Sequence, residues 1–220
     1  MLLPELFEVL DPDPHSAPLN MAIDEALLHQ VEQPTLRIYR WREPAVSFGY
    51  FGPVAEAERV AIGRVIVRRW TGGGIVEHGE DVTYTLIVPR EHVFFQRGAP
   101  ESYRLIHEAI GELLASEGVR AEVVPVVDSR GGGECFASPV QYDLVADGRK
   151  IAGAAQRRTR WGLLHQGSIR VNAPLVSFAG RLAGVLGAKV TRSALPDEVQ
   201  SAAHVLAATK YGTDAWLRRH

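Results

Sequence analysis

The chain has 220 residues, of which 46% are hydrophobic and 23% are charged, and its formal net charge is −2. This balance is typical of one globular domain with a full core, and it lacks the basic excess that would favour nucleic-acid binding. The single cysteine, Cys135, excludes an internal disulfide and a cysteine-based metal cluster within one chain.

Residues 1–14 carry no basic leader, and no apolar run reaches the ~18 residues of a membrane span, so we expect a cytoplasmic protein that binds no membrane.

The pattern of the first half of the chain predicts mixed strands and helices. A strand is expected at 6–11, and the apolar period over 16–34 predicts a helix. Further strands are expected at 35–41, 45–51, 64–70 and 82–89, with a helix at 53–61.

The second half continues this mixture. Residues 102–118 have the clearest amphipathic pattern, and Gly118 is expected to end that helix. Asp147 and Gly148 form a preferred two-residue turn, which predicts a hairpin over 141–156. Further strands are expected at 121–127 and 162–171, and helices at 175–187 and 197–212. The order predicts one α/β (α+β) domain whose mixed, largely antiparallel sheet is flanked by helices.

Three consecutive glycines, Gly72, Gly73 and Gly74, lie between two predicted strands. No phosphate-loop or dinucleotide-binding glycine pattern is present. Glycine is used where the backbone needs unusual dihedrals or where another group must lie against it. Two interpretations stay open: a plain hairpin turn, or a loop whose N–H groups face an anion or an acyl carbonyl, with Arg69 beside them.

The predicted hairpin contains Lys150, one of three lysines against 21 arginines in the chain. Pairing outward from the turn places Leu144 opposite Ile151 in the core, and Lys150 on the other face within reach of Asp143. The small residues at 153–155 leave room for a ligand. An ordinary cross-strand ion pair stays open beside a catalytic lysine.

Two lone side chains are ambiguous by themselves. His78 lies near Asp81, but no second histidine stands at metal-ligand spacing, so we expect no zinc site. A structural histidine stays open beside a functional one. Cys135 follows a glycine run, where an unpaired cysteine is either a buried apolar residue or a nucleophile that Lys150 could activate.

Several stretches together resemble the lipoate–protein ligase A / octanoyltransferase superfamily, which includes biotin–protein ligases. They are NMAIDEALL, LRIYRWREPAVSFGYF, RRWTGGGIVEHGEDVTYT, YDLVADGRKIAGAAQRR and GLLHQGSI, in the family's order over residues 17–172. The resemblance implies a biotin/lipoate ligase-like catalytic domain whose glycine loop wraps the acyl chain and its activated carbonyl end. The lysine at position 150 would contact that carbonyl. About 48 residues follow the last stretch, so we expect a single domain over 1–220, without the C-terminal accessory domain of lipoate ligases.

Cys135 and the FGYF stretch resemble the cysteine-dependent octanoyltransferase branch of this family. The resemblance implies transfer of an octanoyl or lipoyl group from acyl carrier protein, through a cysteine thioester, to a lysine of a lipoyl domain or of the glycine cleavage H protein. No cofactor, metal or nucleic acid is expected.

The expected site residues follow from this resemblance. The catalytic residues are Cys135 and Lys150. The substrate-binding residues are Arg69, Gly72, Gly73, Gly74, Val76, His78, Asp143, Gly153, Ala154 and Ala155. Val76, Val145, Gly153 and Ala155 are small enough to line an acyl tunnel. The arginines at 37, 40, 42, 157, 158 and 160 are expected either to dock an acidic carrier protein or to be solvated surface charges.

Three alternatives stay open: an ATP- and Mg²⁺-dependent lipoate ligase, an amidotransferase between lipoyl-accepting proteins, and a non-catalytic acyl-binding protein. Two positions depart from the family pattern. Tyr142 stands where ATP-using ligases have Asn, which disfavours the ligase. Gly79 follows His78 where relatives commonly have Asp, which leaves the role of His78 open. A biotin ligase fits worse, because the GRGRxGRxW loop is absent.

Overall fold

The computed structural model describes residues 1–125, 139–171 and 175–219. The helices are α1 (Ala17–Gln30), α2 (Val54–Val60), η1 (Val93–Gln96), α3 (Ala99–Ser116), α4 (Leu175–Leu186), α5 (Asp197–Leu206), η2 (Ala207–Tyr211) and α6 (Asp214–Leu217). The strands are β1 (Leu3–Leu10), β2 (Thr35–Tyr39), β3 (Ala45–Phe48), β4 (Val65–Arg68), β5 (Val76–His78), β6 (Val82–Pro89), β7 (Glu122–Val123), β8 (Leu144–Ala146), β9 (Arg149–Arg158), β10 (Gly162–Ile169) and β11 (Gly187–Ala194). None of these described helices combines the length and apolar character that crossing a bilayer requires.

The strands form two sheets. The large one has eight strands in the order β11-β1-β2-β6-β10-β9-β8-β7, and the small one has the order β4-β3-β5. In the large sheet β1 is parallel to β11 and to β2, and the remaining pairs are antiparallel. The predicted α/β class with a mixed, largely antiparallel sheet is confirmed.

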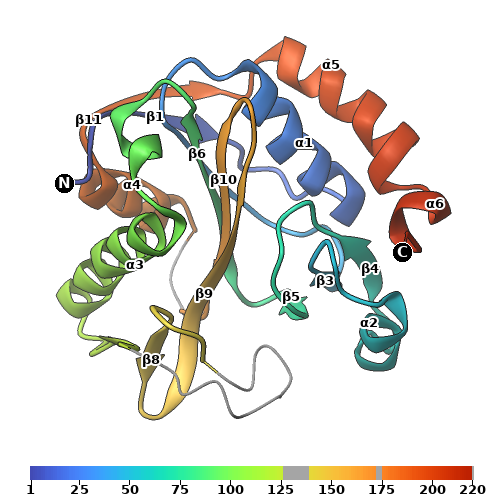
Figure 1. Cartoon of the computed structure of the whole chain (residues 1–220), viewed down its shortest axis with the longest axis horizontal. Coiled ribbons are helices and arrows are strands. Elements are labelled where there is room, and N and C mark those ends of the chain that lie inside the picture. Colours follow the sequence, from blue (N-terminus) through green and yellow to red (C-terminus); the bar gives the residue numbers. More distant parts are fainter. Residues whose placement is uncertain (126–138, 172–174, 220) are drawn as a thin grey trace.

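Helices cover both faces of the large sheet. Figure 1 shows α3 and α4 on one side of it, and α1 and α5 on the other. The central strand β6 is buried along its whole length because it faces both layers. Its residues Tyr84 and Leu86 belong to the cluster under α3 and α4, and Ile87 belongs to the cluster under α1.

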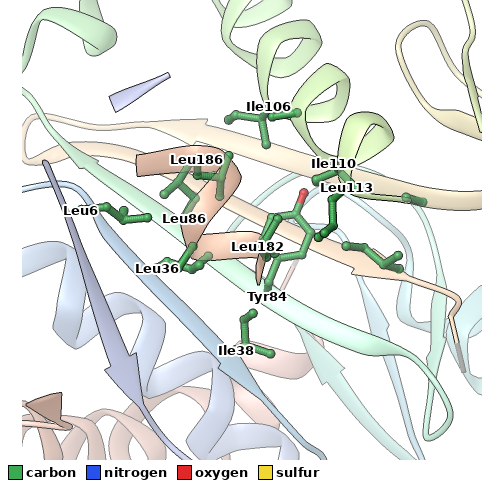
Figure 2. Close-up of a cluster of buried hydrophobic side chains, with 14 of the residues drawn as sticks. Leu6, Leu36, Ile38, Tyr84, Leu86, Ile106, Ile110, Leu113, Leu182 and Leu186 are labelled. Carbon is green, nitrogen blue, oxygen red and sulfur yellow. The ribbon is translucent and has the colours of Figure 1, made fainter. Parts of the chain in front are cut away.

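The larger hydrophobic cluster joins the sheet to α3 and α4. Figure 2 shows Ile106 and Ile110 of α3 converging with Leu182 of α4 on the side chains of β1, β2 and β6. Burial of each such side chain stabilises the fold by about 1.5–3 kcal/mol. This packing fixes α3 over the sheet, and α3 also carries polar side chains toward β9.

The ends of α3 follow the predicted signals. Pro100 lies in the first turn, where its missing N–H removes no helical hydrogen bond. Gly118 has a φ of +84°, and the N–H of Val119 bonds back to the carbonyl of Leu114 at 2.9 Å. The left-handed glycine therefore ends the helix as predicted.

The hairpin turn is confirmed, but the predicted pairing of Leu144 with Ile151 is wrong. Asp147 and Gly148 both have positive φ, 50° and 71°, as this two-residue turn requires. An irregularity between Leu144 and Val145 shifts the pairing, so that Leu144 lies opposite Ala152 rather than Ile151. Leu144 and Ala152 are the residues that enter the core. A bulge of this kind leaves no clear mark in the hydrophobic alternation.

Two other segments differ from the sequence-based expectation. Residues 187–194 were not predicted as a strand, yet they form β11 beside β1. Their side chains are mostly exposed, so the segment has little apolar alternation to reveal it. The strand expected at 121–127 is short, Glu122–Val123, within the described residues. The strands β4 and β5, which flank the glycine loop, belong to the small sheet, whereas β8 and β9 of the hairpin belong to the large one.

Candidate active site

The glycine loop connects β4 to β5 and has a defined shape. Gly73 has a φ of +81°, which only glycine adopts easily. Nη2 of Arg69 donates to the carbonyls of Gly72, at 3.1 Å, and of Gly74, at 2.9 Å. A Cβ on Gly49 would meet the carbonyl oxygen of Gly73 at 1.9 Å, so the loop rests directly on the backbone of Gly49. The loop is therefore held from inside by Arg69 and from below by a second glycine.

This loop faces β9 across a pocket of about 90 Å³. A Cβ on Gly73 would lie 3.4 Å from the Cβ of Ala155, which shows how closely the loop approaches β9. Of the residues expected at the site, the pocket is lined by Arg69, Gly73, Gly74, Val76, His78, Lys150, Gly153, Ala154 and Ala155. The structure thus brings two segments about 75 positions apart in the sequence to one cavity.

Lys150 projects into this pocket from the start of β9. Its Nζ lies 2.7 Å from Oδ2 of Asp143, and the lysine side chain is 9% exposed. A Cβ on Gly153 would lie 2.3 Å from Cε of Lys150 and 2.6 Å from its Nζ. The lysine therefore crosses over the backbone of Gly153, and the absence of a side chain there makes the crossing possible.

Asp143 is fully buried and receives three donors. Besides Lys150, the N–H of Val140 donates to Oδ2 at 2.7 Å, and the hydroxyl of Tyr103 donates to Oδ1 at 2.7 Å. Tyr142, just before it, has a φ of 71°, a region that asparagine adopts more readily than tyrosine. The predicted Lys150–Asp143 pair is confirmed, while Asp143 supports the lysine rather than lining the pocket.

His78 forms a second polar network in the pocket. Its Nδ1 lies 2.8 Å from Oδ2 of Asp81, and its Nε2 lies 2.6 Å from Oγ of Ser47. The carboxylate can only accept, so Nδ1 carries the proton. Nη1 of Arg69 donates to Oγ of Ser47 at 2.7 Å, and the serine hydroxyl in turn donates to Nε2. Burial lowers the pKa of His78, although the hydrogen bond with Asp81 opposes this, and the imidazole is neutral near pH 7.

Trp41 and His78 form a wall at one end of the pocket. Their rings are stacked, with centroids 4.1 Å apart and an interplanar angle of 17°. Nε1 of Trp41 donates to Oγ1 of Thr83 at 2.8 Å, which fixes the ring. Both residues also line a second, wider groove of about 1210 Å³, whose other lining residues include Arg40, Arg64 and Arg170. The stacked pair therefore separates the small pocket from this charged groove.

Sequence reasoning missed several pocket residues. Ser47, Trp41 and Gln166 lie within the stretches that carry the family resemblance, but no local signal marks them. Nε2 of Gln166 donates to Asp24 at 2.7 Å, and Thr71 donates to Oε1 of Gln166 at the same distance. Asp24 is fully buried on α1. A charged residue between the apolar positions of a predicted helix was the available signal.

Two expected features lie differently from the prediction. Gly72 belongs to the loop and Val145 to β8, but neither lines the pocket. Arg37 is fully buried, and its guanidinium pairs with Asp24 and Asp11, so it cannot contribute to a docking surface. Its pKa is raised: burial lowers it, but the two carboxylates outweigh burial.

The other arginines of the expected docking surface remain accessible to different degrees. Those at 40, 42 and 160 are exposed. Arg157 and Arg158 are half-buried, donating to the carbonyls of Trp70 and Phe95 respectively.

Cys135 lies outside the described residues. Among the residues that are described, no group of three or more His, Cys, Asp or Glu side chains is arranged to hold a metal ion.

The strand before the glycine loop is tied to the end of the chain. The guanidinium of Arg68 is buried, and it donates to the carbonyls of Tyr50 and Gly52, both at 2.8 Å. It also donates to the carbonyls of Leu217, at 2.8 Å, and of Arg219, at 3.0 Å. Figure 1 shows the resulting position of α6 beside β4.

Comparisons with known proteins agree with this geometry. The model of the lipoyl protein ligase A/B catalytic domain matches residues 16–210. A protein of Oceanobacillus iheyensis named octanoyltransferase LipM is 36% identical over 174 residues, which cover 75% of this chain and 64% of that protein. The protein of the same name from Brevibacillus brevis is 30% identical over 266 positions, covering 93% of this chain and 96% of its own length.

The fold has a similar solved structure. A putative lipoate protein ligase from T. acidophilum with bound lipoic acid superimposes with a TM-score of 0.77 and 21% sequence identity, covering 99% of both chains. This chain spans about two thirds of the length of the Oceanobacillus relative. The family model covers most of the chain, and the glycine loop and β9, which both lie within the matched residues, meet at one pocket. The chain belongs to the lipoyl protein ligase A/B catalytic domain family.

Proposed function

We propose that this protein is an octanoyltransferase of protein lipoylation. The observation that carries the proposal is the shared pocket, in which a cationic lysine, a glycine loop and a strand of small residues meet. Relatives that are 30–36% identical are named octanoyltransferase, which supports the same activity. The donor is an octanoyl thioester of acyl carrier protein, and the acceptor is a lysine of a lipoyl domain or of the glycine cleavage H protein.

The acyl chain occupies the pocket between the glycine loop and β9. Val76, Gly153 and Ala155 present small apolar surface, and each methylene removed from water contributes about 0.8 kcal/mol to binding. Lys150 lies at the same pocket and can place positive charge at the acyl carbonyl. The tail then points toward the wall formed by Trp41 and His78.

The transfer proceeds in two balanced steps. The Cys135 thiolate attacks the carbonyl of the donor thioester, a C–S bond to Cys135 forms, the C–S bond to the carrier breaks, and the departing carrier thiolate takes up the proton that the cysteine has lost. The acceptor amine then attacks the Cys135 thioester, a C–N bond forms, the C–S bond breaks and the amine proton is released. Lys150 stabilises the oxyanion in both steps, and its charge favours the cysteine thiolate. Thioester exchange is near balance and amide formation is downhill, so ATP is not needed.

An ATP-dependent lipoate ligase is the principal alternative. Its support is the shared fold with a lipoate protein ligase, at an identity of 21%, which speaks for the fold alone. Tyr142 disfavours it, because ATP-using members have asparagine there. An amidotransferase would use the same residues with a different donor protein.

One experiment separates these functions. The protein is incubated with octanoyl acyl carrier protein and a lipoyl domain, with and without ATP, and intact masses are measured. We expect an octanoyl increment on the lipoyl domain without ATP, and a transient increment on the enzyme that Cys135→Ala abolishes. Cys135→Ser should react slowly and leave a more stable ester. An active Cys135→Ala variant that needs ATP would establish the ligase instead.

Lys150→Ala serves as the control for the site. Both mechanisms place the ammonium at the reacting carbonyl, so this variant should be impaired with either donor. A fully active Lys150→Ala variant would show that acyl transfer takes place away from the pocket.

A further inference from the structure

We infer that Tyr103 of α3 is a positioning residue for the Lys150 ammonium, acting through Asp143. The inference rests on the proposed function, in which Lys150 stabilises the acyl carbonyl. Tyr103 does not line the pocket, and it reaches the site only through its hydroxyl. No sequence pattern had marked it.

The two oxygens of the Asp143 carboxylate accept from different donors. Oδ2 receives Lys150 and the N–H of Val140, both at 2.7 Å. Oδ1 receives the Tyr103 hydroxyl, also at 2.7 Å. Burial keeps water from replacing the phenol at Oδ1, so loss of the phenol would leave the carboxylate less firmly oriented toward the lysine. The phenol therefore fixes which oxygen faces Lys150.

The phenol of Tyr103 is also hydrogen-bonded to the pocket wall. The N–H of Ala154 donates to the Tyr103 oxygen at 2.9 Å, and Ala154 lines the pocket. The pairing of β8 with β9 ends at Ala152, so two residues later the phenol takes the position that a neighbouring strand would occupy. One oxygen thus connects α3, the backbone of β9 and the partner of Lys150.

The phenol of Tyr103 keeps its proton. Burial raises the pKa of Tyr103 well above its ordinary value, and the nearby Asp143 charge raises it further. The hydroxyl therefore remains protonated, and a hydrogen-bond donor, near neutral pH. The ring itself is held by a T-shaped contact with His107, with centroids 4.2 Å apart. Tyr103→Phe keeps this packing and removes only the hydroxyl.

The neighbouring residue provides a matched control. Ser102 is also buried on α3, and its hydroxyl also reaches β9, at Oε1 of Gln156 with a distance of 3.2 Å. Within the described residues its hydroxyl contacts the carbonyl of Ala99 and Gln156, and neither Asp143 nor Lys150. Ser102→Ala removes one buried hydroxyl between the same two elements and leaves the ion pair intact.

The kinetic test compares the two variants in octanoyl transfer. Tyr103→Phe should lower kcat roughly tenfold with KM for the carrier protein unchanged, since one hydrogen bond to a charged group is lost away from the docking surface. Ser102→Ala should keep the wild-type kcat. If Tyr103 acts through Asp143, the double variant Tyr103→Phe/Asp143→Asn should be no slower than Asp143→Asn alone. Multiplying losses, or equal losses in Tyr103→Phe and Ser102→Ala, would overturn the inference.

A second readout does not depend on catalysis. The chain has three lysines, so labelling with an amine-reactive ester can be followed at each of them by peptide mass spectrometry, with the exposed Lys189 as internal reference. Lys150 should be labelled faster in Tyr103→Phe than in Ser102→Ala or wild type, because its partner is no longer fixed. Unchanged Lys150 labelling would overturn the inference. Faster labelling in a protein that transfers no octanoyl group would support it and reject the proposed function.

Discussion

Gly153→Ala tests how closely the position of Lys150 is controlled. The added Cβ would lie 2.3 Å from Cε of Lys150, 2.6 Å from its Nζ and 3.0 Å from Oδ1 of Asp143. Ordinary contacts of this kind begin at 3.4 Å, so the end of the lysine must move by about 1 Å. The backbone at Gly153 does not have a left-handed φ, so alanine itself is not strained.

The expected effect is large on catalysis and small on stability. A misplacement of about 1 Å in a catalytic group lowers the rate by roughly 10²-fold. The weakened ion pair destabilises the fold by about 1.5–3 kcal/mol, and the loss of glycine flexibility in the unfolded chain offsets about 0.4–1 kcal/mol of this. A net change of about 1–2 kcal/mol corresponds to a fall in Tm of roughly 3–6 °C for a chain of this size.

The assay measures kcat for octanoyl transfer and Tm on the same preparations. Gly184→Ala is the matched control, because that glycine lies within α4 and nothing stands within 4 Å of the added Cβ. It should keep the wild-type kcat and a Tm at or above that of wild type. A Gly153→Ala variant with wild-type kcat would refute the reasoning, since it would mean that Lys150 can move by an ångström without consequence.

Three further predictions concern the wall, the acid limb of stability and the buried arginine. Trp41→Ala should open the pocket toward the neighbouring groove, and in a competition assay it should shift the acyl preference from octanoyl toward longer chains. Trp41→Phe should shift this preference less. An unchanged chain-length profile would contradict the assignment of Trp41 to the pocket wall. Burial raises the pKa of Asp81, but hydrogen bonds with His78 and Ser168 outweigh burial and lower the pKa from 3.8 to about 2. The ionised Asp81 therefore stabilises the folded state above about pH 4, and this stabilisation is lost as the pH falls toward 2. Asp81→Asn should therefore lower the free energy of unfolding at pH 6 by about 2 kcal/mol in urea titrations and converge with wild type near pH 2; equal stabilities at pH 6 would contradict this. Arg37→Ala should destabilise the fold by about 3–5 kcal/mol, because it leaves Asp24 and Asp11 buried without their cation, while the exposed Arg160→Ala should change only the salt dependence of the transfer rate; the opposite pattern would restore Arg37 to the docking surface.

The sequence predicted the parts of the site that depend on local pattern. The Asp147–Gly148 turn folds the chain back on itself, so that Lys150 of β9 lies near Asp143, just before β8, and this proximity was predicted from the turn. The glycine loop was recognisable because three glycines interrupt two strands. In both cases the information lies within a few neighbouring residues.

The rest depended on contacts between distant segments. Tyr103 looks like any aromatic residue on an amphipathic helix, and only its distance to Asp143 reveals its hydrogen bond. Arg37 looked like a surface charge because its two carboxylate partners lie 13 and 26 positions earlier in the chain. Gly153 lines the pocket, but only the structure shows that the side chain of Lys150, from the same strand, also passes over it.

The contacts of Arg68 bear on how this protein can be shortened or fused. Its buried guanidinium has backbone carbonyls as hydrogen-bond partners, and those of Trp216, Leu217 and Arg219 belong to the last turn of the described chain. Deleting that turn would leave a buried cation short of acceptors one residue before Arg69, which holds the glycine loop. A loss of acyl binding after removal of that turn would therefore reflect damage to the loop rather than removal of a contact with the substrate.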